Sequence, residues 1–461
     1  MTMGLADKVY ARLPQRGQDA AASAFGLYRH WLRSGPGYSK LVAGYRERDA
    51  WPAERHDAYQ AAQLQRLLRD AAEHVPYYRE AWSDGEKRAA REGRLQELPL
   101  LPKDPVRLRP DDFAREDMRP LPRFRFLTSG STGTPVTTLW TAREARDARA
   151  LREVRSANWA GVSFDEGRAT FSGRMVVTDP HSRGPFHRYN RVENQVYFSA
   201  FHLARGNADQ YVEALWRHRV QWLTGYAVSW YLLARHVLDR GLKVPPLKAV
   251  VTTSEKLMPN MRAVMEEAYG CRVHEEYGTV ENAVFASECA HGRLHASPDA
   301  GVVEILRPDG SPCDPGEPGE VVATGFIRRY QPFIRYRVGD VAAWGDAPCP
   351  CGRPMPVLGE IVGRIEDVVR GADGREMVRF HGIFVGQDNV VEGQVVQETL
   401  DRIVVKVVPT AGFGEADSED IRSRIRQRLG DVDVAVETVA EIPRSASGKF
   451  QAVISHVGRE R

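Results

Sequence analysis

The feature that most constrains the fold is an alternation of short apolar runs with amphipathic helical stretches between residues 169 and 269. Strands of a parallel sheet read as continuous apolar runs, because helices cover both faces of the sheet. The alternation therefore predicts an α/β body with largely buried parallel strands. Strands are expected at 169–171, 175–177, 222–226 and 249–253, and helices at 211–216, 230–238 and 261–269.

The pattern on either side of this body is different. After Gly301 the apolar runs 302–306, 321–324 and 341–344 are separated by hairpin-type Gly and Pro pairs, which predicts an antiparallel, barrel-like β unit. The last hundred residues read as a small α+β unit with its own core. The sequence thus divides into a helical part at 1–100, a body at 101–365 and a C-terminal unit at 366–461.

The charge balance narrows the range of partners. With 64 basic and 61 acidic residues the formal net charge is +3, so no strongly charged partner such as nucleic acid or an anionic membrane is expected. No window approaches the roughly 18 consecutive apolar residues that a bilayer requires, and no signal peptide is recognised. We therefore expect a soluble, cytoplasmic protein.

The most distinctive loop is residues 128–135, a run of hydroxyls and glycines between two apolar segments. It reads as strand, loop and strand. Glycines let backbone amides approach an oxyanion, and the hydroxyls add donors, so the loop is suited to holding a phosphate. Neither the dinucleotide-binding nor the Walker pattern is present, and taken alone the run also fits an ordinary surface loop. Its candidate phosphate ligands are Thr128, Ser129, Gly130, Ser131, Thr132 and Gly133.

Four further segments gain meaning when they are read with this loop. Taken singly, each fits a turn or a solvated surface loop. Their order and joint presence are the specific signal. The segments are Tyr277-Gly278-Thr279-Val280-Glu281, Tyr336-Arg337-Val338-Gly339-Asp340, Gly363-Arg364-Ile365-Glu366-Asp367 and Pro443-Arg444-Ser445-Ala446-Ser447-Gly448-Lys449.

In this order and spacing the chain resembles the adenylate-forming superfamily of acyl-CoA synthetases, peptide-synthetase adenylation domains and luciferases. More narrowly it resembles the phenylacetate-CoA ligase and CapK-like branch, over nearly its whole length. The segments 75–79, 98–103, 349–353 and 441–444 share that likeness. The resemblance implies a large multi-subdomain adenylation domain and a small, mobile C-terminal domain that carries a catalytic lysine.

The resemblance also implies roles for individual residues. Lys449 would stabilise charge on the α-phosphoryl group during in-line attack, and Glu281 would help to bind Mg²⁺. Asp340 would accept from the ribose hydroxyls, with Arg364 beside it, and His202 is a candidate for the acyl pocket, although a structural histidine fits equally. The remaining nucleotide-binding candidates are Ser254, Glu255, Tyr277, Gly278 and Thr279.

Three departures from the family pattern bear on function. Glu366 stands where a hinge Asp or Lys is usual, and Val136 stands where a lysine commonly follows the loop. The stretch 368–376 contains a hairpin-type Asp373-Gly374 pair in place of a loop that lines the CoA tunnel in relatives. The acceptor therefore stays open among CoA, a carrier-protein thiol, an amine and a hydroxyl.

These inferences converge on an ATP-dependent ligase of biosynthesis. It would activate a small aryl or hydrophobic carboxylic acid as acyl-AMP with pyrophosphate release, acting as a monomer or homodimer. One alternative is activation of a non-carboxylate oxyanion such as nitrite, and another is a non-enzymatic nucleotide- or acyl-binding protein. A P-loop ATPase or kinase would need a Gly-Lys-Ser/Thr sequence, which is absent.

The five cysteines predict a further site. An odd count in a long chain argues against a disulfide framework. Three thiolates and one imidazole form a closed tetrahedral set for structural Zn²⁺, and Cys289, His291, Cys349 and Cys351 are the expected ligands. His295 or Cys313 can substitute for one of them, and unligated reduced thiols are the alternative.

Overall fold

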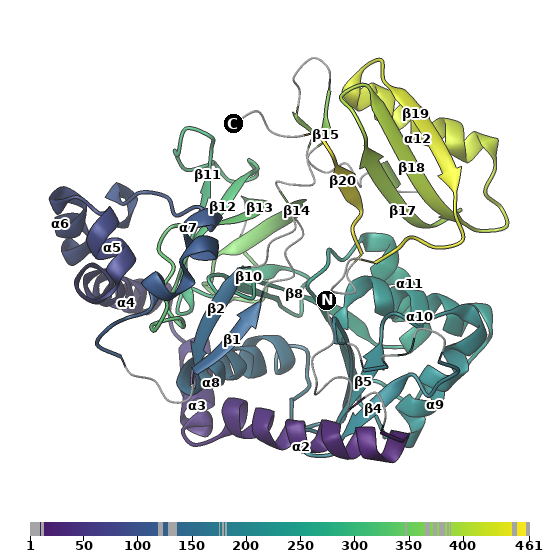
Figure 1. The fold of residues 1–461 in the computed structure, drawn as a ribbon, viewed down its shortest axis with the longest axis horizontal. Coiled ribbons are helices and arrows are strands. Elements are labelled where there is room, and N and C mark those ends of the chain that lie inside the picture. The colour runs from purple at the N-terminus through teal and green to yellow at the C-terminus, as the bar shows by residue number, and fades with distance from the viewer. Residues whose placement is uncertain are drawn as a thin grey trace.

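A computed structural model describes most of the chain: residues 10, 13–118, 123–127, 136–174, 176–177, 179, 182–345, 348–364, 369–371, 376–377, 383–384, 387, 389–444 and 450–457. Helices form the N-terminal part (Figure 1). They are α2 (Gln15–Ser34), α3 (Tyr38–Asp49), α4 (Ala53–His74), α5 (Pro76–Ala81), α6 (Asp84–Glu92) and α7 (Lys103–Leu108), with 3₁₀ turns η1 (Leu95–Glu97) and η2 (Pro110–Phe113).

The N-terminal helices share a core with strands late in the chain. The buried face of α4 includes Leu68 and Ala71, and it packs in one cluster with Val321 and Tyr336. The hydroxyl of Tyr78 donates to the carbonyl of Pro332 over 3.0 Å inside this core. Residues 1–100 are therefore not an independent folding unit.

A 12-stranded mixed sheet forms the centre of the body, in the order β11-β12-β13-β14-β10-β9-β8-β7-β6-β3-β5-β4. Strands β5, β3, β6, β7 and β8 are parallel to one another, and the remaining neighbours are antiparallel. The parallel half is built from β3 (Arg168–Ser172), β5 (Gln195–Ser199), β6 (Trp222–Tyr226), β7 (Ala249–Thr253) and β8 (Arg272–Gly278), with β4 (His187–Asn190) at its edge.

Both faces of the parallel strands are covered, as their apolar sequence predicted. Leu223 and Val250 pack against the helices α9 (Ala208–Arg217), α10 (Ala227–Asp239) and α11 (Pro259–Tyr269). On the other face, Trp222 and Val251 pack in one cluster with Ala157 of the π-helical turn η3 (Glu153–Ala157), which continues α8 (Ala142–Arg152). One expected strand is wrong: Val176 and Val177 lie in bends of the β3–β4 connection, where they pack on Tyr197.

The strands after Gly301 are antiparallel as predicted, but they extend the same sheet and do not form a separate closed barrel. Leu101 pairs alongside Tyr336 at this end, so the connector from the N-terminal helices joins the sheet. The strands from Gly301 onwards are β11 (Gly301–Leu306), β12 (Gly319–Gly325), β13 (Tyr336–Trp344) and β14 (Val357–Arg364). Two short antiparallel strands precede them, β9 (Phe285–Glu288) and β10 (Leu294–Ala296).

The C-terminal unit has a sheet and a core of its own (Figure 1). Its four strands run in the order β19-β18-β17-β20, and Ile421 and Ile425 of the helix α12 pack on them. A two-stranded hairpin precedes it. The elements are β15 (Val369–Arg370), β16 (Glu376–Met377), β17 (Val390–Gln397), β18 (Arg402–Pro409), α12 (Glu415–Leu429), β19 (Asp433–Thr438) and β20 (Val453–Ser455).

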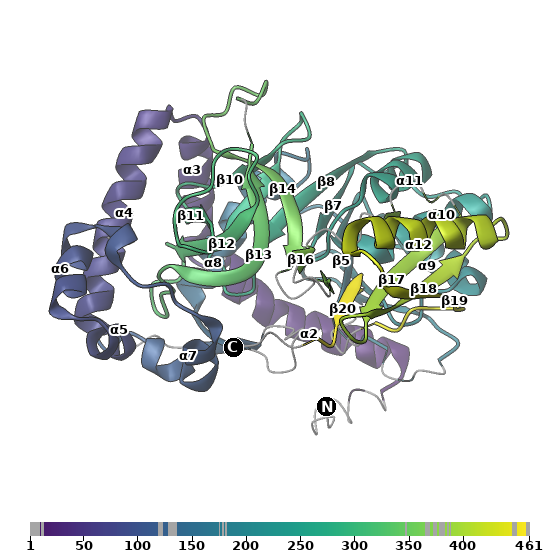
Figure 2. The ribbon, with the colours of Figure 1, turned by 90° about the horizontal axis from the view of Figure 1, so that it is seen from above.

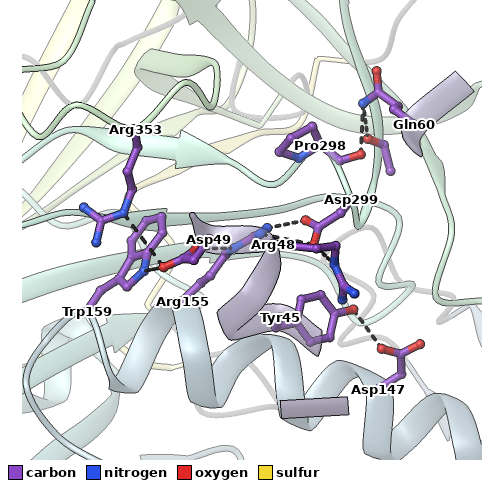
Figure 3. Close-up of polar contacts among 11 residues, drawn as sticks. Tyr45, Arg48, Asp49, Gln60, Asp147, Arg155, Trp159, Pro298, Asp299 and Arg353 are labelled. Atoms are coloured by element: carbon purple, nitrogen blue, oxygen red, sulfur yellow. Dashed lines mark hydrogen bonds and ion pairs between the residues drawn. The ribbon is translucent and has the colours of Figure 1, made fainter. Parts of the chain in front are cut away.

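A buried ionic network fixes α3 and η3 against the body (Figure 3). Arg48 and Arg155 both bind the carboxylate of Asp299, whose side chain is inaccessible to solvent. Arg155 also donates from Nε to Asp49 Oδ1 over 3.1 Å, and the other oxygen of Asp49 accepts from Trp159 Nε1 over 2.7 Å. Each buried charge in this group has a partner, which the burial of ions requires.

Candidate functional site

The candidate site lies at the carboxyl edge of the parallel strands, where ligands of α/β sheets bind. The predicted phosphate-binding loop lies in the chain between β1 (Arg123–Leu127) and β2 (Thr137–Thr141), an antiparallel pair in which Leu127 faces Thr137. This confirms the two predicted strands. The loop itself, with candidates Thr128, Ser129, Gly130, Ser131, Thr132 and Gly133, lies outside the described residues.

The end of β8 brings two predicted nucleotide ligands together. Tyr277 donates its hydroxyl to Asp340 Oδ2 over 2.8 Å, although the two residues lie on strands that are not neighbours. Asp340 is buried on β13, directly opposite Arg364 in the β13–β14 register. Gly339 precedes it at φ +83°, a conformation that favours glycine. An aromatic ring and a carboxylate are thus held at one edge. Gly278 ends β8 beside them.

Glu281 lies in the turn that follows β8 and is buried at 8% exposure. Its Oε1 accepts a hydrogen bond of 3.0 Å from Tyr336, a residue of β13. The hydroxyl of Thr279 in the same turn is buried and has no hydrogen-bond partner among the described residues. A buried carboxylate beside an unsatisfied hydroxyl is a donor set that suits a hard cation such as Mg²⁺.

Arg328 links this turn to the β1–β2 hairpin, and no pattern in the sequence pointed to it. Its side chain is fully buried, donates to the carbonyls of Glu281 and Leu139, and lies 4.3 Å from the ring centroid of Trp140. Burial lowers the pKa of Arg328 to about 10, so it stays protonated near neutral pH. This guanidinium therefore fixes β2 relative to the candidate magnesium ligand.

Glu255 joins the body to the C-terminal unit. Its Oε2 accepts from the backbone N–H of Val228 at the start of α10, and its Oε1 accepts from the backbone N–H of Phe450, both over 2.9 Å. Ser254 before it has φ +72°, a strained conformation for a residue with a side chain. Lys449 itself lies outside the described residues, but its neighbour in the chain is hydrogen-bonded at this edge.

His202 lies after β5 at the same edge, and both of its ring nitrogens have partners. Nδ1 is 2.7 Å from Ser199 Oγ and Nε2 is 2.8 Å from the carbonyl oxygen of Asp179. The ring also stacks on Phe186 with centroids 5.3 Å apart. These contacts favour a structural role for His202 over a place in the acyl pocket. The predicted hinge residue Glu366 and the side chain of Arg364 lie outside the described part of the chain.

The aromatic residues on the strands near this edge belong to the core. Phe198 is 1% exposed and packs on Trp230 and Phe171, while Trp222 packs on Phe164 from the other face of the sheet. These rings carry no argument for an aryl acid.

A cluster of sulfur and nitrogen ligands lies at the other end of β9. Cys289, His295, Cys349 and Cys351 place one ligand atom each within 4.8 Å of all the others. This corrects the predicted set at one position: His295 replaces His291. His291 is exposed in the β9–β10 turn, where its backbone N–H approaches Cys289 Sγ, whereas His295 lies on β10 and points inward.

The hydrogen bond of His295 leaves one of its ring nitrogens available to bind a metal ion. His295 Nδ1 lies 3.1 Å from the carbonyl of Met355, which assigns the proton to Nδ1 and leaves Nε2 towards the thiols. Nε2 is 3.4 Å from Cys351 Sγ, and Cys289 Sγ is 3.6 Å from Cys349 Sγ. Burial lowers the pKa of His295, which favours the neutral ligand form. The donor set and its supporting bond fit a closed, tetrahedral zinc site.

Residues 374–456 match the CapK C-terminal domain family. The chain is 26% identical over 374 residues to Protein CapK of Staphylococcus aureus, covering 79% of this chain and 80% of that protein. It is 23% identical over 450 residues to phenylacetate-coenzyme A ligase of Thermus thermophilus, covering 88% and 98%.

The fold is also that of a solved ligase. 2-Hydroxyisobutyryl-CoA ligase in its postadenylation state superposes with a TM-score of 0.68 at 22% identity, covering 89% of this chain and 91% of that one. The same enzyme in its thioesterification state gives a TM-score of 0.54 at 21% identity, covering 88% and 91%. These findings confirm the resemblance inferred from the sequence: the chain is similar to CapK and to phenylacetate-CoA ligase, and it has the fold of an adenylate-forming ligase. No described helix has the length and apolar character to cross a membrane.

Proposed function

We propose that the protein activates a small carboxylic acid as its acyl-AMP, releases pyrophosphate, and then transfers the acyl group to a thiol acceptor, with CoA as the first candidate. The observation that carries this proposal is the hydrogen bond from Phe450 to Glu255. It holds the residue after Lys449 at the edge where Tyr277 and Asp340 meet. Phosphoryl-type transfer needs positioned charge more than covalent chemistry, and a lysine delivered to this edge supplies it.

The residues of the edge divide the work of binding ATP. In this proposal Asp340 accepts from the ribose hydroxyls, Tyr277 packs against the adenine and orients Asp340, and the loop at 128–135 holds the phosphates. Glu281 and the hydroxyl of Thr279 would hold Mg²⁺, which neutralises phosphate charge when it is bound. Arg328 supports this arrangement by fixing the strand that follows the loop.

In the proposed acyl transfer step, Lys449 moves away from the nucleotide site so that the acceptor can enter. Members of the superfamily rotate the C-terminal domain between two arrangements. The higher TM-score with the postadenylation form than with the thioesterification form supports the view that this structure has the first arrangement. Breaking the bond from Phe450 to Glu255 would then be part of the rotation, and Glu366 is the proposed hinge.

We also propose that Cys289, His295, Cys349 and Cys351 bind one structural Zn²⁺. The closed donor set leaves no open position for a substrate, so the ion would stabilise the loops around β9 and β10. Metal analysis of the purified protein tests this, with one equivalent of zinc expected.

The activity is tested by screening pyrophosphate release from ATP and Mg²⁺ against aryl, amino, hydroxy and fatty acids, without an acceptor. Mass spectrometry should identify AMP or the acyl-AMP. A single strong acid confirms adenylation, and adding CoA then tests the acceptor. Release of ADP and phosphate would contradict the proposal.

A further inference from the structure

Five arginine side chains gather between α2, α8 and the strands β3 and β5, away from the edge described above. Two lie one turn apart on α2, one lies on α8, and two belong to β3 and the residues after it. We call these residues the arginine cluster: Arg29, Arg33, Arg149, Arg168 and Arg174.

Aromatic rings hold the cluster in two linked groups. The guanidinium carbons of Arg29 and Arg174 lie 5.8 and 5.9 Å from the ring centroid of Phe25 on α2. Arg174 also lies 4.7 Å from the ring of Tyr197 on β5. Contacts with aromatic faces orient guanidinium groups without neutralising their charge.

The second group surrounds Phe164. Arg149 and Arg168 lie 3.5 and 5.4 Å from its ring centroid. Glu193 connects the two groups, because its Oε2 accepts from Tyr197 over 3.3 Å and lies 3.8 Å from Arg168 Nη2. Glu193 is therefore the carboxylate that lies between the two groups.

The charges in this region do not balance. Glu193 is buried, and its Oε1 has no hydrogen-bond partner among the described residues. Glu153, the other buried carboxylate nearby, accepts instead from the neutral groups Asn158, Ser163 and the backbone of Phe164. Among the described residues, the one carboxylate within 4 Å of these five guanidiniums is Glu193, which lies 3.8 Å from Arg168 Nη2.

Individual members carry unsatisfied donors. Arg149 is 9% exposed, and its Nε is buried without a hydrogen-bond partner among the described residues. The Nε of Arg29 is also buried and also lacks a hydrogen-bond partner there. Burial, followed by the charge of Arg174, lowers the pKa of Arg29 to about 10, and burial and Arg149 lower the pKa of Arg168 to about 9. Arg29 and Arg168 therefore remain cationic near neutral pH. A protein that keeps buried cations unpaired bears a large cost unless a ligand offsets it.

We propose that the arginine cluster binds a small anion with at least two negative charges, of the phosphate or dicarboxylate type. The planar fork of arginine matches both oxyanions through paired hydrogen bonds. Arg29 also lies 5.4 Å from the ring of Phe126, in the strand that leads into the loop at 128–135. The anion would therefore sit beside the hairpin of the nucleotide site. The proposal is independent of the adenylating activity.

The test is a titration of the full-length protein with inorganic phosphate and, separately, succinate, by calorimetry at constant ionic strength. Arg33→Gln should weaken binding of at least one anion about tenfold, the loss of one charge-assisted contact. The matched control is Arg16→Gln, which changes an exposed arginine on the same helix. Arg174→Gln, outside any helix or strand, is the second variant if Arg33→Gln does not fold.

A second readout separates a binding site from a structural cluster. With no anion added, removing one of several mutually repelling cations should raise the melting temperature of Arg33→Gln or Arg174→Gln above that of the wild type. Structural arginines would lower it. Equal affinities of the wild type and both variants for both anions would overturn the proposal. Phosphate that binds only at the loop at 128–135 would give this result, because its affinity would not depend on Arg33 or Arg174.

Discussion

The body and the C-terminal unit are held by very different means. Within the body, α3 and η3 are fixed by buried ion pairs around Asp299, and the N-terminal helices share one core with the antiparallel strands. The C-terminal unit has a separate core and lies to one side of the body (Figures 1 and 2), and Phe450 meets Glu255 across the boundary through one backbone hydrogen bond. The difference suggests a rigid platform and a unit that can be released.

The largest expected effect on stability comes from removing a buried ion pair around Asp299. Arg155→Met should lower the free energy of unfolding by about 3–5 kcal/mol, because it leaves Asp49 and Asp299 short of a buried partner. Denaturant unfolding measures this. Arg337→Met removes an ion pair with Glu320 at an exposed site and should cost less than about 1 kcal/mol. Equal losses of unfolding free energy in the two variants would mean that the buried network stabilises the fold no more than an exposed ion pair does.

The same network has a pH signature. Burial alone would raise the pKa of Asp299, but Arg155 and Arg48 outweigh it and hold the pKa below its usual value. The resulting stability is present above the unfolded-state pKa and is lost as pH falls through the folded-state pKa. Arg155→Met should therefore lose less stability than the wild type when both are acidified.

Lys449→Ala tests whether the C-terminal unit acts in the adenylation half-reaction alone. Removing the proposed charge stabiliser should slow acid-dependent ATP–pyrophosphate exchange by roughly 10²–10³-fold, while thioester formation from supplied acyl-AMP stays within a fewfold of normal. Lys406→Ala, in strand β18 of the same unit, is the control. A parallel loss of both half-reactions would point to misfolding and not to a role in adenylation.

Removing zinc should affect the platform and spare the C-terminal unit. Cys349→Ser should lose the bound metal and about 2–3 kcal/mol of stability, the size expected when a ligand present at about a hundred times its dissociation constant is lost. Cys313→Ser is matched to it, since both thiols are 8% exposed and only Cys349 belongs to the cluster. Full zinc retention in Cys349→Ser would contradict the assigned ligand set.

The smallest effect is expected at the boundary. Glu255→Gln keeps the shape of the side chain but weakens its hydrogen bonds to two backbone amides, so adenylation should fall about tenfold. The transfer half-reaction should be unchanged or faster. Glu360→Gln, which changes the neighbouring ion pair with Lys256, serves as the control. A loss confined to the transfer half-reaction would refute the role of Glu255 as a latch.

Local patterns predicted the elements well and long-range partnerships poorly. Strands such as β6 and β7 and helices such as α10 followed from periodicity, because each is buried along its own length. The strand predicted at Val176 and Val177 was wrong because two apolar residues bury equally well in a bend. A short run of this kind carries too little pattern to separate a strand from a packed turn.

Site residues followed the same rule. The segment ending in Glu281 was visible in the sequence, whereas Arg328 gave no signal because its partners come from β2 and from the turn after β8. The exchange of His291 for His295 depends on which residue β10 turns inward. Glu255 was identified, but its bond to Phe450 spans 195 residues and needs the folded arrangement of both units.

The shared core of the N-terminal helices has a consequence for synthesis on the ribosome. Tyr78 finds its partner, the carbonyl of Pro332, 254 residues later in the chain. At translation rates of about 5–20 residues per second, that partner emerges roughly 13–50 s after Tyr78. The apolar face of α4 and α5 must stay shielded during this interval. Nascent chains of this protein are therefore expected to engage a chaperone before the last strands of the body appear.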